Sequence, residues 1–322
     1  MILKFLKFLV GCFAATLFIC GVVHSKESQE VFTGVYLNDV INVDIKANTY
    51  VADFYLWFRW RGELDPSDSF EFVNAFSTWS HTKQKLYEVP KILEGGWKYQ
   101  VIHINGDFHH PFILNNYPLD EQKIVISIED SIRTKDGIRY IADTTHSSYR
   151  KDISIPGWQI LGQNISASPF KYDTQFGELA EDASEEYWRV NYVVHVGRNK
   201  KLYLFKMLLP IIVVLLCTLA IFFINPVYSD SRLALAITAL VSAVAMHITV
   251  SADLPTVGYL VLIDKIYNLS YIAIFCALAE TVFTIYLKDR AQFTLAKKID
   301  HYTFFVVSMC FLISCFGVIY FR

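Results

Sequence analysis

Residues 229–255 read SDSRLALAITALVSAVAMHITVSADLP, and this stretch decides how the chain is organised. It is long and apolar enough to cross a bilayer as a helix, yet it carries Ala, Ser and Thr where lipid-facing helices usually carry large aliphatic side chains. A spacing of three to four residues places one set of mostly small side chains on a single stripe: Asp230, Ala234, Thr238, Val241, Ala245, Ile248 and Ala252.

The stripe has two explanations. Tight packing between membrane helices favours small residues and accounts for most of it. The alternative is that several copies surround a water-filled pathway. Val241 and Ile248 would then form apolar constrictions, and the Thr238 hydroxyl would help a partly hydrated ion to pass. A ring of Asp230 side chains at one mouth would attract cations, although Ser229 or Asp230 could instead cap the helix. Arg232 faces about 200° away from Asp230 on a helical wheel and does not cancel that ring.

Composition supports a membrane protein. The 322 residues are 53% hydrophobic and 19% charged, and the net charge of −2 with no basic stripe argues against nucleic-acid binding. Residues 1–25 have early lysines, an apolar centre and small residues before Lys26, which is typical of a cleaved signal peptide, with a retained N-terminal anchor as the alternative.

Motifs of catalysis and cofactor binding are missing from the sequence. It has no nucleophile elbow, HExxH, P-loop or GxGxxG, and residues 26–206 contain no cysteine. We therefore expect no enzyme activity, no cofactor and no metal site.

Period-two alternation dominates the chain before residue 200. In residues 51–60, one face carries Ala52, Phe54, Leu56, Phe58 and Trp60. Similar runs, separated by turn signals, occur at 70–76, 99–104, 123–129, 138–143 and 187–196. Residues 26–200 are therefore predicted to form an all-β, antiparallel, immunoglobulin-like sandwich on the extracellular side.

Apolar segments dominate the rest of the chain, residues 201–322. They predict a bundle of four transmembrane helices at about 203–224, 230–252, 259–287 and 301–321. An exported sandwich places the C-terminus outside as well, and the loops at 225–232 and 288–300 in the cytoplasm. The second loop has four basic residues against two acidic ones, in agreement with the positive-inside rule.

Four motifs occur in a fixed order along the chain: YPLD (117–120), RNKKLYLFKMLLP (198–210), SDSRL (229–233) and SADLPTVGYLVLIDKI (251–266). Together they closely resemble the pentameric ligand-gated ion channels, the Cys-loop receptor superfamily. His110 and Ile124 stand near the positions of the family's bracketing cysteines, so the resemblance is to the prokaryotic branch that lacks this disulfide.

The resemblance implies a homopentamer, in which each chain has four identical partners, around a central pore lined by the stripe. It places the protein in a bacterial inner membrane, in contact with lipid, with both the N-terminal domain and the C-terminus on the periplasmic side. It implies a small extracellular agonist at the subunit interface, and the ring of Asp230 carboxylates predicts monovalent cations as the permeant ions. The implied coupling residues between sandwich and membrane are Asp44, Lys46, Asp120, Arg198, Pro255 and Tyr259.

The resemblance also implies an aromatic ligand pocket, whose residues are Tyr55, Glu129, Asp130, Ser131, Tyr172 and Tyr187. Aromatic faces beside carboxylates attract ammonium groups, so a small amine is the predicted agonist. Two alternatives stay open: a membrane sensory receptor that does not conduct, and a proton-gated channel. His247 is a candidate proton sensor for the second, with helix packing as its competing role.

Overall fold

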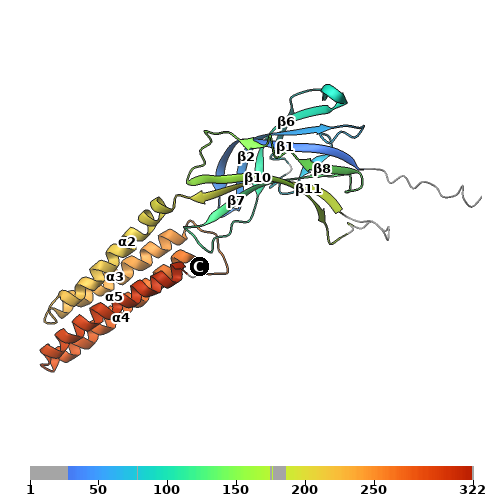
Figure 1. Cartoon of the computed structure of the whole chain (residues 1–322). Coiled ribbons are helices and arrows are strands. Elements are labelled where there is room, and N and C mark those ends of the chain that lie inside the picture. Colours follow the sequence, from blue (N-terminus) through green and yellow to red (C-terminus); the bar gives the residue numbers. More distant parts are fainter. Residues whose placement is uncertain (1–27, 78, 175, 177–185, 321–322) are drawn as a thin grey trace, which may run out of the picture.

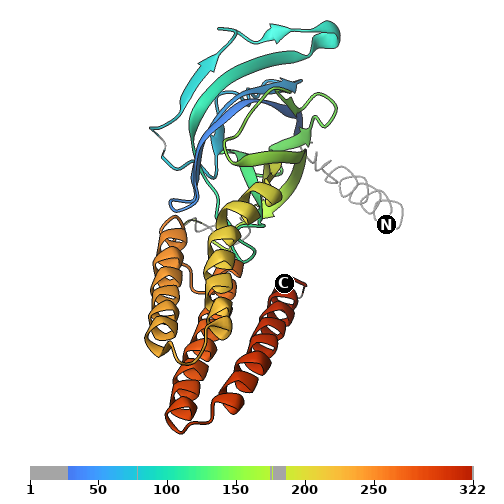
Figure 2. The same cartoon turned by 90° about the vertical axis from the view of Figure 1, so that its left-hand side faces the viewer.

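The computed structural model describes residues 28–77, 79–174, 176 and 186–320. A β-sandwich stands at one end, and four long helices run away from it in an elongated bundle (Figures 1 and 2). The predicted signal peptide lies outside the described residues.

Two sheets form the sandwich. The seven-stranded sheet has the order β4-β6-β2-β1-β8, with β5 beside β6 and β9 beside β1. The four-stranded sheet has the order β10-β11-β7-β3. The strands are β1 (Gln29–Asp44), β2 (Thr49–Trp60), β3 (Phe70–Phe72), β4 (Thr82–Lys85), β5 (Lys91–Ile92), β6 (Lys98–His109), β7 (Glu121–Asp130), β8 (Ile138–Ala142), β9 (Ser148–Tyr149), β10 (Trp158–Lys171) and β11 (Glu186–Arg198), with a single 3-10 turn at Glu94–Gly96.

The alternating side chains of β2 form the centre of the sandwich core. As the periodicity predicts, the core face of this strand is fully buried: Ala52, Phe54, Leu56, Phe58 and Trp60. The opposite sheet contributes Val190, Tyr192, Val194 and Val196 of β11. Burying two such faces against each other holds this cysteine-free domain together without a disulfide.

The sandwich departs from the sequence prediction in two places. The β1 strand pairs with β8 and β9 in parallel, so the sheets are not purely antiparallel. The β3 strand ends at Phe72, although the alternating pattern continues to residue 76. Asn74 is the reason, because its side-chain amide bonds to the β7 backbone at Val125 O (2.7 Å) and Ser127 N (2.9 Å), where a strand would use its main chain.

The helical domain consists of α2 (Lys200–Ala220), a 3-10 turn (Ile221–Phe223), α3 (Ser229–Ser251), α4 (Leu262–Asp289) and α5 (Phe293–Tyr320). All four helices, α2 extended by its 3-10 turn, are long and apolar enough to cross a membrane. Figure 2 shows them side by side below the sandwich.

Three of the four helices begin away from their predicted starts, and the first begins at Lys200 and not near 203. The third helix begins at Leu262 and not near 259, and the fourth begins at Phe293 and not near 301. The predicted loop at 288–300 is therefore mostly helix. Ala291 takes a left-handed φ of 61° and reverses the chain at once, with Gln292 N–H donating to Leu287 O at 3.0 Å.

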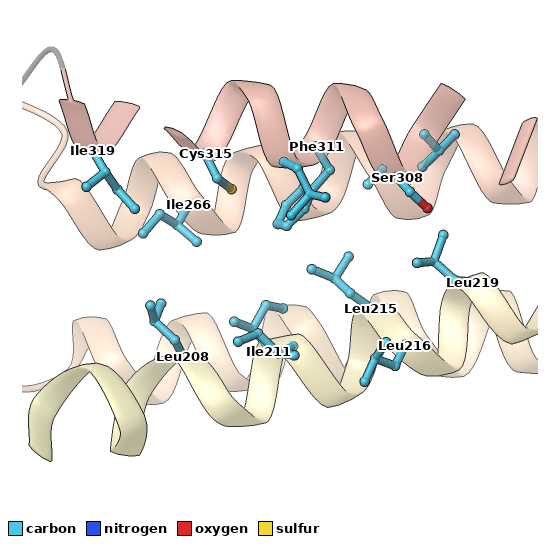
Figure 3. A pocket seen from close by; sticks show the side chains of 14 residues that line it. Leu208, Ile211, Leu215, Leu216, Leu219, Ile266, Ser308, Phe311, Cys315 and Ile319 are labelled. Atoms are coloured by element: carbon cyan, nitrogen blue, oxygen red, sulfur yellow. The ribbon is translucent and has the colours of Figure 1, made fainter. Parts of the chain in front are cut away.

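An apolar cavity of about 410 Å³ separates α5 from α2. Figure 3 shows side chains of the two helices facing each other across this space, among them Leu208, Ile211 and Leu215 on one side and Phe311 and Cys315 on the other. Helix α3 contributes no residue to its lining. The cavity therefore lies among α2, α4 and α5.

Candidate ion pathway, gating junction and ligand site

The two sides of α3 have different surroundings. The members of the predicted stripe are all exposed in the single chain, with Val241 63% and Ile248 66% accessible. The side facing α2 and α4 is buried and holds Arg232, Ala236, Ala239 and Ala243. Small residues thus allow close helix packing on one side, while the stripe residues are left exposed in the single chain.

Arg232 is fully buried at the start of α3. Its Nη1 donates to Thr284 Oγ1 at 3.2 Å and its Nη2 to Glu280 Oε2 at 3.3 Å, and it forms an ion pair with Asp300 of α5. A buried guanidinium is tolerated only with such partners. Its positive charge is therefore withdrawn from the stripe and ties the foot of α3 to the two following helices.

Asp230 stands in the first turn of α3 and is exposed. The residue at the cap position is Tyr228, which makes no side-chain capping bond, and Ser229 Oγ donates to Pro226 O at 3.4 Å. Capping by Ser229 or Asp230, which the sequence allowed, is therefore wrong. The Asp230 carboxylate makes no salt bridge to a described residue and projects from the exposed side of the helix.

Near its other end, α3 is held by His247. The ring nitrogens lie 2.8 Å from Tyr271 Oη and 3.0 Å from Asp264 Oδ1, both on α4, and the ring stacks on Tyr267 at 4.7 Å. His247 lies off the stripe, and these contacts favour the packing role over a place in the pathway. The same carboxylate accepts Val261 N–H at 3.1 Å and so fixes the start of α4.

The junction of the two domains contains a buried ion pair. Arg198, the last residue of β11, donates from Nε to Asp120 Oδ1 at 2.8 Å, and the side chains are 5% and 1% exposed. Gln122 donates to the other carboxylate oxygen at 2.6 Å. Only Asn199, which caps α2 through Leu202 N, separates this strand from the first membrane helix.

Aromatic rings enclose the guanidinium of Arg198. Its Cζ lies 4.2 Å from the ring centre of Trp158, 4.8 Å from Tyr117 and 5.1 Å from Tyr203. Burial raises the pKa of Tyr117 to about 12, so this hydroxyl stays neutral beside the pair. The rings exclude water from the pair, and both charges therefore depend on each other.

The loop before β7 docks on the start of α4. The N–H groups of Leu262 and Ile263 donate to Asn115 O (3.0 Å) and Tyr117 O (3.2 Å), which satisfies two free donors of the helix. Tyr259 accepts Leu114 N–H at 3.1 Å. These bonds join the sandwich directly to the segment that follows α3.

The other implied coupling residues form no such link. Asp44 only accepts the N–H groups of Lys46 (2.8 Å) and Ala47 (3.0 Å) within its own turn, and the exposed Lys46 side chain has no salt bridge in the described part of the chain. Pro255 is half-buried in the segment between α3 and α4.

Part of the implied ligand pocket comes together on the four-stranded sheet. Tyr172 Oη donates to Glu129 Oε2 at 2.9 Å, and its ring meets that of Tyr187 edge-on at 5.8 Å. Arg189 also pairs with Glu129. Burial and the bond to Glu129 raise the pKa of Tyr172.

Two implied pocket residues have structural bonds instead. Asp130 is buried and bound to Ser69 (2.5 Å) and Arg133 (3.1 Å), and Ser131 Oγ donates to Ser69 O at 2.8 Å. Both side chains therefore close the turn after β7, and none of their hydrogen bonds reaches Tyr172.

Tyr55 lies on the other sheet, on the side away from the core. Its ring stacks on His103 at 4.7 Å, and His103 is bound to Asp53 at 2.6 Å. A pocket that includes both Tyr55 and Tyr172 therefore requires the two outer faces of neighbouring chains. Sequence reasoning missed Arg189, Phe170 and His103, whose side chains complete these two faces.

Sequence comparisons bear on the whole arrangement. The chain is 27% identical over 169 residues to a gamma-aminobutyric acid receptor subunit beta of Lymnaea stagnalis, which covers 52% of the chain and 32% of that subunit. It is 23% identical over 312 residues to a protein named proton-gated ion channel of Gloeobacter violaceus, covering 89% of the chain and 82% of that protein. The beta-like receptor subunit of Drosophila melanogaster is 26% identical over 167 residues. No family model matches the chain.

A strand sandwich joined to four apolar helices, together with these similarities, makes the chain a relative of the pentameric ligand-gated ion channels. The chain spans about a third of the length of the receptor subunits that it matches. Its similarity to the Gloeobacter channel, in contrast, extends over most of both proteins. It is a multi-pass membrane protein whose relatives are ion channels and not enzymes.

Proposed function

We propose that the chain is the subunit of a homopentameric, cation-selective channel, opened by a small extracellular agonist bound between neighbouring sandwiches. The main support is the difference between the two sides of α3. The stripe from Asp230 to Ala252 is exposed, while the opposite side packs against the rest of the chain. Five copies that turn this stripe inward would enclose water between apolar rings at Val241 and Ile248.

The charges at the foot of α3 support the proposed cation selectivity. Arg232 is buried and paired with acids, whereas the Asp230 side chain is exposed and has no salt bridge to a described residue. A ring of Asp230 carboxylates would concentrate cations and repel chloride at this mouth. Monovalent cations are the proposed permeant ions.

The aromatic side chains of β10 and β11 support the proposed agonist class. Tyr172 donates to the buried carboxylate of Glu129 and its ring contacts that of Tyr187, and a small amine is the proposed ligand. Tyr55 of the neighbouring chain would complete the pocket. The charge distribution favours a bacterial inner membrane protein with sandwich and C-terminus outside, and lipid chains would fill the cavity between α2 and α5.

Cysteine accessibility tests the ion pathway. In a background where the four described cysteines are replaced by serine, Thr238→Cys and Val241→Cys should allow a water-soluble thiol reagent to block current across a planar bilayer. Ala239→Cys is the matched control, because Ala239 is buried against the subunit and should not react. Modification of position 239 but not of 238 and 241 would refute the proposed orientation of α3.

Selectivity is tested separately. Asp230→Asn should move the reversal potential in a sodium chloride gradient toward zero, because it removes one carboxylate per subunit from the mouth. An unchanged reversal potential and single-channel current would remove Asp230 from the mechanism.

Proton gating is the second candidate, favoured by the similarity to the Gloeobacter proton-gated channel over most of the chain. Steps to lower pH without any organic ligand should then open the channel. A protein that never conducts under amines, carboxylates or acid would instead be a sensory receptor.

A further inference from the structure

A cation already occupies the aromatic face of the proposed ligand site. The guanidinium of Arg189 lies over the ring of Phe170, with 3.5 Å from Cζ to the ring centre, and also contacts the ring of Tyr172 at 5.8 Å. An ammonium agonist would seek the same surface.

The carboxylate of this site is also occupied. One oxygen of Glu129 is bound by Arg189 Nε, and the other accepts the hydroxyl of Tyr172 at 2.9 Å. Arg189 Nη2 donates to the same hydroxyl at 3.1 Å. The nearby acids are paired too, Asp130 with Arg133 and Glu186 with Lys135.

The two partners of this ion pair differ in their freedom. Glu129 is 2% exposed and is held between paired strands, whereas the Arg189 side chain is 16% exposed. Glu129 cannot lose its cation without leaving a buried charge alone. The arginine can exchange, because a long side chain at the surface regains water when it leaves.

From this geometry we propose that Arg189 is the resident cation of the ligand site, and that an ammonium agonist binds by displacing its guanidinium from Glu129 and Phe170. This inference rests on the proposed function and deepens it. Exchange of one cation for another keeps Glu129 neutralised throughout. It also makes Arg189 the residue that sets how strongly amines bind.

A free carboxylate could use the site differently. Arg189 Nη1 donates to no described residue, so an anionic ligand could bind this edge without breaking the pair with Glu129. Arg189 would then hold the ligand, and its loss would abolish binding. The two modes predict opposite effects of one substitution.

The experiment compares butylamine with butyrate, which are similar in size and opposite in charge. Purified full-length protein in detergent is titrated with each probe, and thermal stabilisation reports binding independently of conduction. We expect Arg189→Gln to lower the half-saturating butylamine concentration by about tenfold. In this variant butylamine no longer has to break the cation–π contact with Phe170 and the ion pair with Glu129.

Three variants control this result. Arg139→Gln removes an arginine that lies over Trp188 at 5.5 Å and pairs with Glu30, away from Glu129, so butylamine binding should stay at the native level. Arg189→Lys keeps the pair with Glu129 but loses the planar stacking, and should give an intermediate gain. It also serves if Arg189→Gln does not fold. Adding Glu129→Gln to Arg189→Gln should abolish the gain.

The proposal is overturned if Arg189→Gln leaves butylamine binding unchanged or weaker, and a concurrent loss of butyrate binding would assign Arg189 to an anionic ligand. It is equally overturned if butylamine stabilises neither the native protein nor the variants. A tenfold gain in binding without any current would instead reject the channel and leave the exchange of cations intact.

Discussion

Removing both partners of the Asp120–Arg198 pair should destabilise the protein by less than the sum of the two single removals. Arg198 is 5% exposed, its Nε lies 2.8 Å from Asp120 Oδ1, and three aromatic rings exclude water from it. Breaking such a buried pair on one side costs about 3–5 kcal/mol, because the remaining charge has no partner. We therefore expect Asp120→Asn and Arg198→Gln each to lower the free energy of unfolding by this amount.

The double variant removes both charges and leaves two neutral hydrogen-bonding groups. Its loss should be smaller than the sum of the single losses, with a coupling energy of about 2–3 kcal/mol. Denaturant unfolding of the purified full-length protein in detergent measures all four members of the cycle. Agonist-activated ionic currents of the same variants show whether the coupling energy also changes the equilibrium between closed and open states.

Lys200→Gln provides the matched control for this cycle. Lys200 begins the helix two residues after Arg198 and pairs with Glu121 at 3.1 Å, but both side chains are more than half exposed. An exposed pair contributes about 0–1 kcal/mol, so this variant should remain close to the native protein. If Asp120→Asn and Arg198→Gln add to within about 0.5 kcal/mol in the double variant, the pair is not the energetic link described above.

Three further outcomes follow from buried or half-buried polar groups. Burial lowers the pKa of His81, so the folded state loses stability as pH falls below the ordinary histidine value of about 6.5; His81→Gln should flatten this dependence of the melting temperature, and an unchanged slope would exclude His81 as its source. Tyr50→Phe should cost about 1–3 kcal/mol of unfolding free energy, because the Tyr50 hydroxyl bonds both the N–H and the C=O of Val125, and a loss below the error of denaturant titration would contradict this. Arg232→Gln should reduce the yield of assembled oligomer on size-exclusion chromatography, since it leaves Asp300 buried without its cation, and a normal yield would show that the pair is dispensable.

The sequence predicts those features that repeat at short range. Alternation in β2 identifies the buried face from Ala52 to Trp60, and small-residue spacing identifies the exposed stripe of α3. Both patterns arise from a single element whose period fixes which side chains point together. The pairing of Asp120 with Arg198 has no such local signal, and only the resemblance to a known family suggested it.

The missed features depend on contacts between distant segments. Residues 293–300 carry several charges and look like a loop, but Asp300 reaches Arg232 inside the bundle and the segment is helical. The position of Arg189 over Phe170 arises from the pairing of two strands across a hairpin. The Asn74 side-chain amide takes the place of main-chain hydrogen bonds beside β7, and no periodic pattern in the sequence indicates this.

The attachments of α3 restrict how any central opening could widen. Near one end Arg232 binds side chains of α4 and α5, and near the other His247 binds two side chains of α4. The helix is thus clamped at both ends to a neighbour in its own chain. A rotation of α3 alone would break both sets of contacts. A rigid-body rotation of α3 together with α4 would preserve the His247 contacts and those of Arg232 with α4, and would therefore cost less free energy.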